Sequence, residues 1–339
     1  MKLLPLCLAA VLAAAGVLTG CSSADGTNSG SSSPAVLESA DAKEERPAAE
    51  DGSGWPRTIT DASGRQVVLE TCPRRIAILH SMYLEYFFAL ETPPAASAGS
   101  STGTAMDALR EWETLKPYAG TAEILDLGSS RELNLEAVLE AEPDVIVTFQ
   151  GHGGLETVYD QLTRIAPVIL LDYQASWQEQ TMDCAQIIGK EEEAGALIAE
   201  VESAIAGARE KILAHGEETV ALFRTNGGKS FVTRGDKDYY ETFGLTKPAG
   251  YPDTYETLAL EAVMQMDPDY IIFQDFLDVS RGFVRSQEES AVWNSLTAVK
   301  NGNVVFFDDS FNTFGPLAMK GTAEKLVKVL YDTAEQEGD

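Results

Sequence analysis

The sequence predicts an α/β protein made of two Rossmann-like lobes, each with a parallel-type sheet, joined by one long spine helix. Three observations predict this fold: the size and composition of the chain, an internal repeat, and a proline-free helical segment between the two copies of the repeat. The chain has 339 residues, of which 44% are hydrophobic and 23% are charged. A chain of this size exceeds the length at which one hydrophobic core usually divides into two.

The internal repeat consists of LEAVLEAEPDVIV at residues 135–147 and LEAVMQMDPDYII at residues 260–272. Each copy runs from a short amphipathic helix through Pro-Asp into a nearly continuous apolar segment, which is typical of a strand buried on both faces of a parallel sheet. A further apolar segment follows each copy, at residues 168–172 and 304–308. The repeat therefore indicates two lobes of alternating strands and helices that share one plan.

Each lobe has a candidate opening strand, at residues 75–79 and 219–223. Between the lobes, residues 190–214 contain no proline and carry apolar side chains at helical spacing. A helix of this length would extend roughly 36 Å. We therefore expect a stiff spine and lobes that close only slightly. The expected N-terminal lobe spans residues 55–173, the helical connection residues 174–214, and the C-terminal lobe residues 215–339.

The first 20 residues have the features of a secretory signal peptide, with Lys2 near the start, an alanine-rich apolar run and small residues before the cut. The run is too short and too poor in large apolar side chains for a membrane-spanning helix. It ends in LTGC, which resembles the bacterial lipobox, where cleavage precedes a cysteine that receives lipid. We therefore expect Cys21 to be the lipidated N-terminus and residues 21–54 to form a disordered tether, because they carry almost no large apolar side chains.

Two cysteines, Cys72 and Cys184, remain when the signal peptide and the lipidation site are set aside. An exported protein can form a disulfide from such a pair, but the sequence gives no distance between the two thiols. We favour two separate buried thiols, because a chain of this size does not need a covalent cross-link to be stable.

Acidic residues outnumber basic residues by 53 to 25, which gives a formal net charge of −28. A protein that binds nucleic acid needs clustered cations to neutralise phosphates, and binding to an anionic membrane surface makes the same demand. The composition therefore argues against nucleic acid and against an anionic lipid surface as electrostatic partners.

Several segments, in their order along the chain, resemble the substrate-binding lipoproteins of bacterial ABC importers for iron-siderophores, haem and cobalamin. The resemblance is closest to binders of ferric siderophores of the hydroxamate or citrate type, and it covers most of the chain from Trp55 to Tyr331. The segments are DASGRQVVLETCPRRIAIL at 61–79, NLEAVLEAEPDVIV at 134–147, YDQLTRIAP at 159–167, IIGKEEEA at 187–194, VWNSLTAVKNGNVV at 292–305 and FGPLA at 314–318.

This resemblance implies a helical-backbone substrate-binding protein that captures a ferric siderophore and delivers it to the permease subunits of an ABC transporter. It implies a protein that is held to the cell membrane by its lipid and faces outside the cytoplasm. We expect a monomer without a cofactor, since the ferric chelate is the transported ligand. In this family the glutamate of each LEAV-type helix docks into arginines of the permease, and the corresponding residues here are Glu136 and Glu261.

Ligands of open α/β sheets bind beyond the carboxyl ends of the strands, so the residues that follow the predicted strands are the candidate ligand contacts. They are His80, Tyr83 and His152 in the first lobe and Arg224, Asp275, Arg281 and Phe311 in the second. Arg224 is the strongest candidate, because a planar guanidinium suits the carboxylate or hydroxamate oxygens of a ferric chelate. Tyr83 and Phe311 would stack on the face of the ligand.

Two arginines of the second lobe, the candidate Arg281 and also Arg234, have simpler interpretations. Arg281 is expected on the loop after the repeat strand, where a solvated loop cation is as good an interpretation as a ligand contact. Arg234 belongs to an Arg-Gly-Asp triplet that is most simply a polar turn.

Three other functions are weighed against siderophore binding. A binder of free zinc or manganese would need several histidine and carboxylate ligands, and the chain has only 3 histidines. A haem or cobalamin binder stays open, since His80, Met82 or Tyr83 could supply an axial ligand to haem. An exported enzyme on the same lobes is the alternative from another class, but the sequence has no GxGxxG motif and no nucleophile with a paired base, so we expect no enzymatic activity.

Overall fold

The computed structural model describes residues 54–100, 105–234 and 237–335. The predicted signal peptide, the lipidation site and nearly all of the predicted tether lie outside the described residues. No helix in the described part of the chain is both long enough and apolar enough to cross a membrane.

The first sheet has five strands, and all of its neighbouring strands are parallel. Its order is β5 (Leu125–Asp126), β4 (Ala96–Ser97), β3 (Ile76–Ile78), β6 (Val145–Phe149) and β7 (Val168–Leu171). Strand β3 and the first four residues of β6 are buried, as expected for strands with helices on both faces. An antiparallel pair, β1 (Arg57–Thr60) and β2 (Gln66–Leu69), precedes the sheet.

The second sheet is mixed, whereas the sequence predicted a parallel-type sheet. Its order is β10 (Thr257–Leu258), β9 (Phe231–Thr233), β8 (Val220–Arg224), β11 (Tyr270–Gln274) and β12 (Val304–Phe307). Strands β8, β11 and β12 are parallel, but β9 runs antiparallel to both β8 and β10. The reason is the short connection from β8 to β9, because a parallel return would need a crossover of a dozen or more residues.

The internal repeat is confirmed as one structural unit that occurs in both sheets. Strand β6 lies between β3 and β7, and its counterpart β11 lies between β8 and β12. The aspartate of each Pro-Asp pair binds the start of the neighbouring strand. Asp144 Oδ2 accepts hydrogen bonds from the backbone N–H groups of Arg74 and Arg75 at 2.7 and 2.9 Å, and Asp269 Oδ2 accepts one from Thr219 at 2.8 Å.

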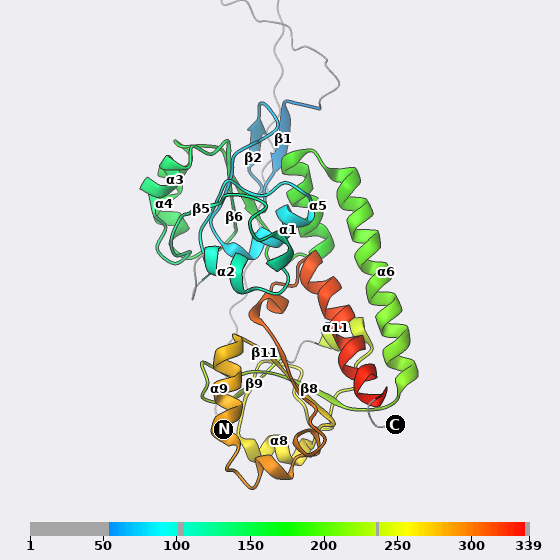
Figure 1. The fold of residues 1–339 in the computed structure, drawn as a ribbon. Coiled ribbons are helices and arrows are strands. Elements are labelled where there is room, and N and C mark those ends of the chain that lie inside the picture. The colour runs from blue at the N-terminus through cyan, green and yellow to red at the C-terminus, as the bar shows by residue number, and fades with distance from the viewer. Residues whose placement is uncertain (1–53, 101–104, 235–236, 336–339) are drawn as a thin grey trace, which may run out of the picture. The chain divides into compact units, whose positions relative to one another are not determined.

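The helices lie on both sides of the sheets (Figure 1). Those of the first lobe are η1 (Ser81–Tyr83), α1 (Leu84–Ala89), α2 (Ala105–Glu111), η2 (Lys116–Tyr118), α3 (Leu135–Glu140), α4 (Leu155–Leu162) and α5 (Trp177–Ile188). Those that follow the spine are α7 (Lys237–Phe243), α8 (Leu260–Met266), α9 (Leu277–Gln287), η3 (Trp293–Ser295), α10 (Thr297–Lys300), η4 (Asp309–Asn312) and α11 (Pro316–Glu335). Arg281 therefore lies on a helix and not on the predicted loop, because Ser280 and Phe283 give this segment a buried helical face.

The predicted spine is helix α6, which has 25 residues (Glu191–His215). Near its start Ala194 belongs to a core of the first lobe, and farther along Val201, Ile205 and Ile212 belong to the core of the second lobe. Figure 1 shows α6 running beside α11. One rigid helix therefore contributes to the packing of both lobes.

The two cysteines do not form a disulfide, and two separate thiols are the arrangement that the sequence favoured. Only one of the two is buried. Cys184 lies fully buried on α5, and burial raises the pKa of its thiol well above the usual range. Cys72 is exposed, contrary to the prediction, because it lies on the segment that follows β2. Its thiol donates a hydrogen bond to the carbonyl oxygen of Ile188 at 3.3 Å.

A buried carboxylate connects the two lobes. Glu85 on α1 is 1% exposed and accepts hydrogen bonds from the backbone N–H groups of Gly315 at 3.1 Å and Ala318 at 2.9 Å, at the start of α11. A side chain at position 315 could not be accommodated, since a Cβ atom there would lie 2.3 Å from the Glu85 carboxyl carbon. Burial raises the pKa of Glu85 to about 7, although hydrogen bonds from Thr313 and from the α11 backbone oppose the shift.

We predict that replacing Glu85 by glutamine removes part of the pH dependence of stability. The pKa of this carboxyl is about 7 in the folded state against 4.5 for the free group, so the folded state holds the proton more tightly. Its contribution is complete below about pH 4.5 and is lost as the pH rises to about 7. The free energy of unfolding should therefore fall by up to about 3 kcal/mol across this window in the wild type, and by less in Glu85→Gln.

Urea unfolding at pH 5 and pH 8 measures this difference. The control is Glu111→Gln, an exposed position on α2, which should keep the wild-type pH dependence. The assignment is wrong if Glu85→Gln and Glu111→Gln show the same change in stability between the two pH values.

Candidate functional site

The carboxyl ends of the first sheet carry an uncharged aromatic surface. Phe149 at the end of β6 lies between His80 and Tyr173, with ring centroids 5.7 and 5.4 Å away. Burial, and secondarily the nearby His152, lowers the pKa of His80 to about 4, so this imidazole is neutral at pH 7. Tyr173 is 48% exposed. This surface, made of His80, Phe149 and Tyr173 and called the aromatic wall below, can contact the organic part of a ligand without a charge.

Two of the predicted ligand residues lie behind the aromatic wall. His152 is 6% exposed, and both of its ring nitrogens have partners: Nδ1 lies 2.6 Å from the Thr148 hydroxyl and Nε2 lies 2.7 Å from the Ser130 carbonyl oxygen. Its ring stacks on Phe149 at 4.8 Å. Tyr83 is fully buried and packs against Phe149 at 6.4 Å. Both side chains support the wall from inside. Tyr83 has no exposed surface, and the small exposed part of His152 lines a separate hollow of about 600 Å³ and not the groove described below.

The strand ends of the second sheet carry an ionic network that contains Arg224. Its Nη2 atom lies 2.7 Å from Asp309 Oδ1 and 3.3 Å from Asp275 Oδ1. The other oxygen of Asp275 accepts hydrogen bonds from the backbone and the hydroxyl of Thr225, at 2.8 and 2.5 Å. Burial raises the pKa of Asp309 in spite of the adjacent guanidinium. Two acids of the same lobe thus balance the charge of Arg224. These ion pairs account for its position at the strand end without a ligand contact.

A different arginine is buried without a counter-charge among the described residues. Arg234 follows β9 and is 7% exposed. Its Nη1 atom donates to the Tyr255 hydroxyl at 2.8 Å, and the guanidinium lies 5.0 Å from the ring centroid of Phe314. Its Nη2 atom is buried without a hydrogen-bond partner, and burial lowers the pKa of the group. An unpaired buried cation is costly, and an anionic ligand oxygen would remove that cost.

The interpretation of Arg234 as part of a polar turn missed this site. The sequence signal for Arg234 was weaker than that for Arg224, because the short strand β9 before it was not among the predicted strands and runs antiparallel to β8. The sequence did not show which of the two arginines has acidic neighbours, because Asp275 and Asp309 follow different strands of the sheet.

A groove of about 1200 Å³ has a lining from both lobes and the spine. The first lobe contributes Met82, Tyr173 and Trp177, the spine contributes Ile205 and Arg209, and the second lobe contributes Tyr239, Tyr255, Asn312 and Phe314. Tyr255 and Phe314 are the aromatic partners of Arg234. A smaller hollow of about 590 Å³ is lined by Arg224, Asp275, Phe276 and Val279. The groove therefore combines aromatic side chains with an adjacent unpaired cation.

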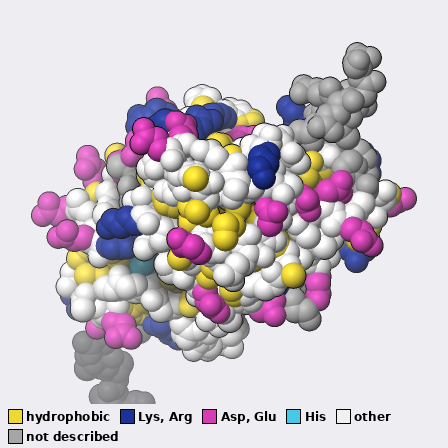
Figure 2. Space-filling model, turned by 90° about the horizontal axis from the view of Figure 1, so that it is seen from below, with side chains coloured by type: hydrophobic (Ala, Val, Ile, Leu, Met, Phe, Trp, Pro, Cys, Tyr) yellow, Lys and Arg dark blue, Asp and Glu magenta, His cyan; other side chains and the backbone are white. Residues whose placement is uncertain are grey.

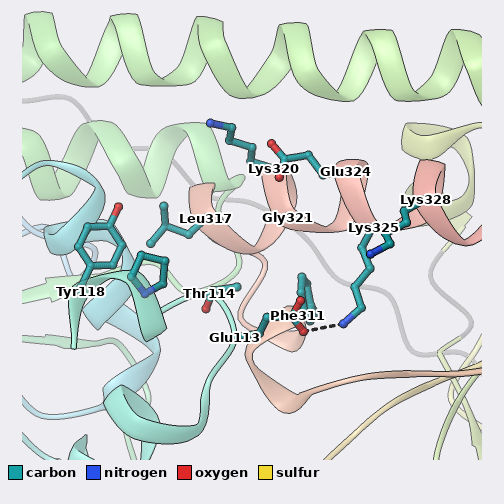
Figure 3. Close-up of a pocket in the computed structure, with 11 residues that line it drawn as sticks. Glu113, Thr114, Tyr118, Phe311, Leu317, Lys320, Gly321, Glu324, Lys325 and Lys328 are labelled. Atoms are coloured by element: carbon teal, nitrogen blue, oxygen red, sulfur yellow. Dashed lines mark hydrogen bonds and ion pairs between the residues drawn. The ribbon is translucent and has the colours of Figure 1, made fainter.

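Another pocket, of about 480 Å³, lies along α11 (Figure 3). Lys320, Lys325 and Lys328 project from this helix in the view. Lys325 pairs with Glu113 at 2.6 Å, and Lys320 pairs with Glu200 at 2.7 Å. This pocket has no strand end of the first sheet in its lining, and two of its cations already have counter-charges, so it is not the candidate site.

The remaining predicted contacts have structural neighbours. Phe311 is 2% exposed and packs against Phe307, with ring centroids 5.2 Å apart, and it lies in the lining of the pocket along α11 and not of the groove. Arg281 is exposed on α9, with its guanidinium 5.8 Å from the ring centroid of Phe306. These positions leave the predicted roles of both residues untested.

Glu136 and Glu261 have equivalent exposed positions in the two lobes. Each lies in the first turn of its repeat helix, α3 or α8, and each is exposed. Figure 2 shows acidic side chains spread over one face of the molecule and basic ones only in small separate groups. The two glutamates are therefore distinguished by their matched places in the repeat and not by their charge.

Within the described residues, no group of three or more His, Cys, Asp or Glu side chains could hold a metal ion. The described part of the site therefore presents hydrogen-bond donors and aromatic surface rather than a set of metal ligands.

Comparisons with known proteins agree with this geometry. Residues 76–310 match the family model described as "Periplasmic binding protein". The Fe(3+)-citrate-binding protein YfmC of Bacillus subtilis is 24% identical over 342 residues, which cover 96% of each chain. The iron(3+)-hydroxamate-binding protein FhuD of the same organism is 26% identical over 303 residues, covering 85% of this chain and 90% of that one.

A solved structure shares the fold. Unliganded FhuD2 from Staphylococcus aureus superposes with a TM-score of 0.64 at 20% sequence identity, over 82% of this chain and 99% of that one. The family match covers more than half of the chain, and it includes both copies of the repeat and the spine between them. The chain therefore belongs to the periplasmic binding protein family.

Proposed function

We propose that this protein captures a ferric siderophore outside the cytoplasmic membrane and delivers it to the permease of an ABC transporter. The observation that carries the proposal is the buried Arg234 guanidinium, whose Nη2 atom has no partner among the described residues and whose aromatic neighbours line the groove. The names of the relatives, which are binders of ferric citrate and ferric hydroxamate, support the same class of ligand.

The groove suits a chelate better than a bare ion. Its volume of about 1200 Å³ is slightly above the range of ordinary small-molecule sites, which is about 300 to 1,000 Å³. A siderophore supplies all the oxygen ligands of its iron, so the protein needs only to match the shape and charge of the complex. The free N–H groups of Arg234 would donate to an anionic oxygen of the chelate, while Tyr173 and Tyr255, both exposed, would pack on its organic part. Binding and release complete this function without a covalent step.

We predict that Arg234→Ala weakens ligand binding and does not lower the melting temperature. Losing a buried charged partner costs about 2 to 5 kcal/mol, or roughly 30-fold to several-thousand-fold in affinity. Stability should be kept or improved, since no described carboxylate loses its partner. Arg234→Lys should restore binding only in part, because an ammonium group lacks the planar fork. Quenching of tryptophan fluorescence measures binding, since Trp177 lines the groove.

The ligands for this titration are ferrichrome, ferric citrate, ferric enterobactin and haem. Arg224→Ala is the matched control: it should lower the melting temperature, because Asp275 and Asp309 would remain without their shared cation. Binding of haem alone, or unchanged affinity in Arg234→Ala, would contradict the proposed site.

We predict that Glu136→Ala and Glu261→Ala reduce uptake of the ferric chelate by cells and leave the affinity of the purified protein unchanged. Exposed ion pairs are individually weak, at about 0 to 1 kcal/mol, so the double variant should show the larger defect. The control is Glu140→Ala, an exposed position at the other end of α3. A double variant that transports like the wild type would refute permease docking through these residues.

We also predict that Cys21 carries the lipid anchor. Cys21→Ala should abolish incorporation of a labelled fatty acid and release the protein from the membrane fraction, because the thiol is the acceptor in the lipobox-like LTGC segment. Cys72→Ala should retain the label. The lipoprotein assignment fails if the Cys21→Ala protein is still labelled.

A further inference from the structure

The positive and negative side chains around the groove nearly cancel one another in the described residues. In the described residues at the strand ends of the second sheet, Arg224 contacts both Asp275 and Asp309, whereas Arg234 has no carboxylate partner. Two cations therefore meet two carboxylates. The aromatic wall on the other side adds no charge, since His80 is neutral at pH 7. The lining of the large groove itself adds one cation, Arg209, and two acids, Glu202 and Glu241. The described cations around the site therefore do not outnumber the described carboxylates.

We propose that Asp309, together with Asp275, is a specificity-determining residue that makes the site select ferric chelates of zero or single negative charge over chelates with several negative charges. The inference rests on the proposed function and adds a ligand class to it. Both carboxylates act by neutralising Arg224, which is the other guanidinium that could meet an anionic ligand at these strand ends.

The position of the network supports this role. Asn312 lines the large groove and donates to Asp309 Oδ1 at 3.2 Å, while Arg224 and Asp275 line the smaller hollow. The Arg224 side chain is 33% exposed and that of Asp309 is 15% exposed. The network is therefore close to both hollows and only partly shielded by water, so its charges act on a bound chelate more strongly than surface charges do.

The two acids differ in what else they do. Asp275 is 4% exposed and also binds Thr225 through its second oxygen, so it holds the loop after β8. Among the described residues, Asp309 has only Arg224 and Asn312 as side-chain hydrogen-bond partners. Asp309→Asn preserves the shape and removes the charge, so it tests selectivity with little change in packing.

The chemistry of iron chelation supplies two contrasting ligand classes. Three hydroxamates each carry one negative charge, so their complex with Fe³⁺ is neutral. Three catecholates each carry two, so their complex keeps three negative charges. A site whose described cations do not outnumber its carboxylates cannot balance the second complex, and the excess charge would face Asp309 and an acidic protein with a net charge of −28.

The test compares ferrichrome, a neutral trihydroxamate complex, with ferric enterobactin, a trianionic catecholate complex, on the full-length mature protein. The wild type should bind ferrichrome at least tenfold more tightly. In Asp309→Asn, affinity for ferric enterobactin should rise about tenfold, because removal of one nearby like charge is worth a little over 1 kcal/mol. Affinity for ferrichrome should change less than threefold. Asp278→Asn, at an exposed position on α9, removes the same charge from the same lobe and should change neither affinity more than threefold.

The possible results distinguish a failure of the selectivity role from a failure of siderophore binding itself. Tighter binding of ferric enterobactin by the wild type, or an equal gain in Asp309→Asn and Asp278→Asn, overturns the selectivity role and leaves siderophore binding in place. Failure of every ferric chelate to quench the fluorescence overturns the proposed function and the inference with it. A selective gain in Asp309→Asn that disappears at high salt supports the inference, because a screened Coulomb term must depend on ionic strength.

Discussion

Helix α6 is the constraint on which the rest of the structure depends, because its side chains belong to the cores of both lobes. Ala194 packs with the first lobe, and Val201, Ile205 and Ile212 pack with the second. An α-helix cannot bend sharply without losing backbone hydrogen bonds or disturbing its packing. The two sheets are therefore held by one stiff element, and Glu85 adds a second connection by capping the start of α11 from the first lobe.

This connection has an electrostatic consequence. Glu85 is buried where the N-terminal N–H groups of α11 favour its charged form, yet desolvation dominates and raises its pKa to about 7. The same competition between burial and partners governs the ligand side. Arg224 lies between two carboxylates and is compensated, whereas Arg234 is buried against aromatic rings and has a donor that no described residue uses. An anionic ligand therefore gains most binding free energy at Arg234, the buried cation that has no carboxylate partner among the described residues.

The two lobes share one plan but contribute different chemistry. In the first lobe, neutral aromatic side chains lie at the ends of the strands, and His152 and Tyr83 pack against Phe149 from the buried side. The second ends its strands in charged side chains. Its antiparallel strand β9 runs back along β8, so Arg234 follows β9 beside Leu222, two residues before Arg224 at the end of β8. An apolar surface opposite a polar one is the arrangement expected for a ligand that has both an organic shell and exposed oxygens.

The sequence by itself determined the architecture. Proline-free helical spacing located α6 to within one residue at each end, and the repeated LEAV and Pro-Asp segments located α3, β6, α8 and β11. These features are local, because hydrophobic periodicity and chain breakers act over neighbouring residues. Only the tertiary structure decided the site. Whether Arg224 or Arg234 is free depends on Asp275 and Asp309, which are distant in sequence from both arginines. Likewise, the burial of Tyr83, His152 and Phe311 depends on packing between elements. Side-chain burial and charge pairing are set by contacts across the fold, and a sequence pattern does not record them.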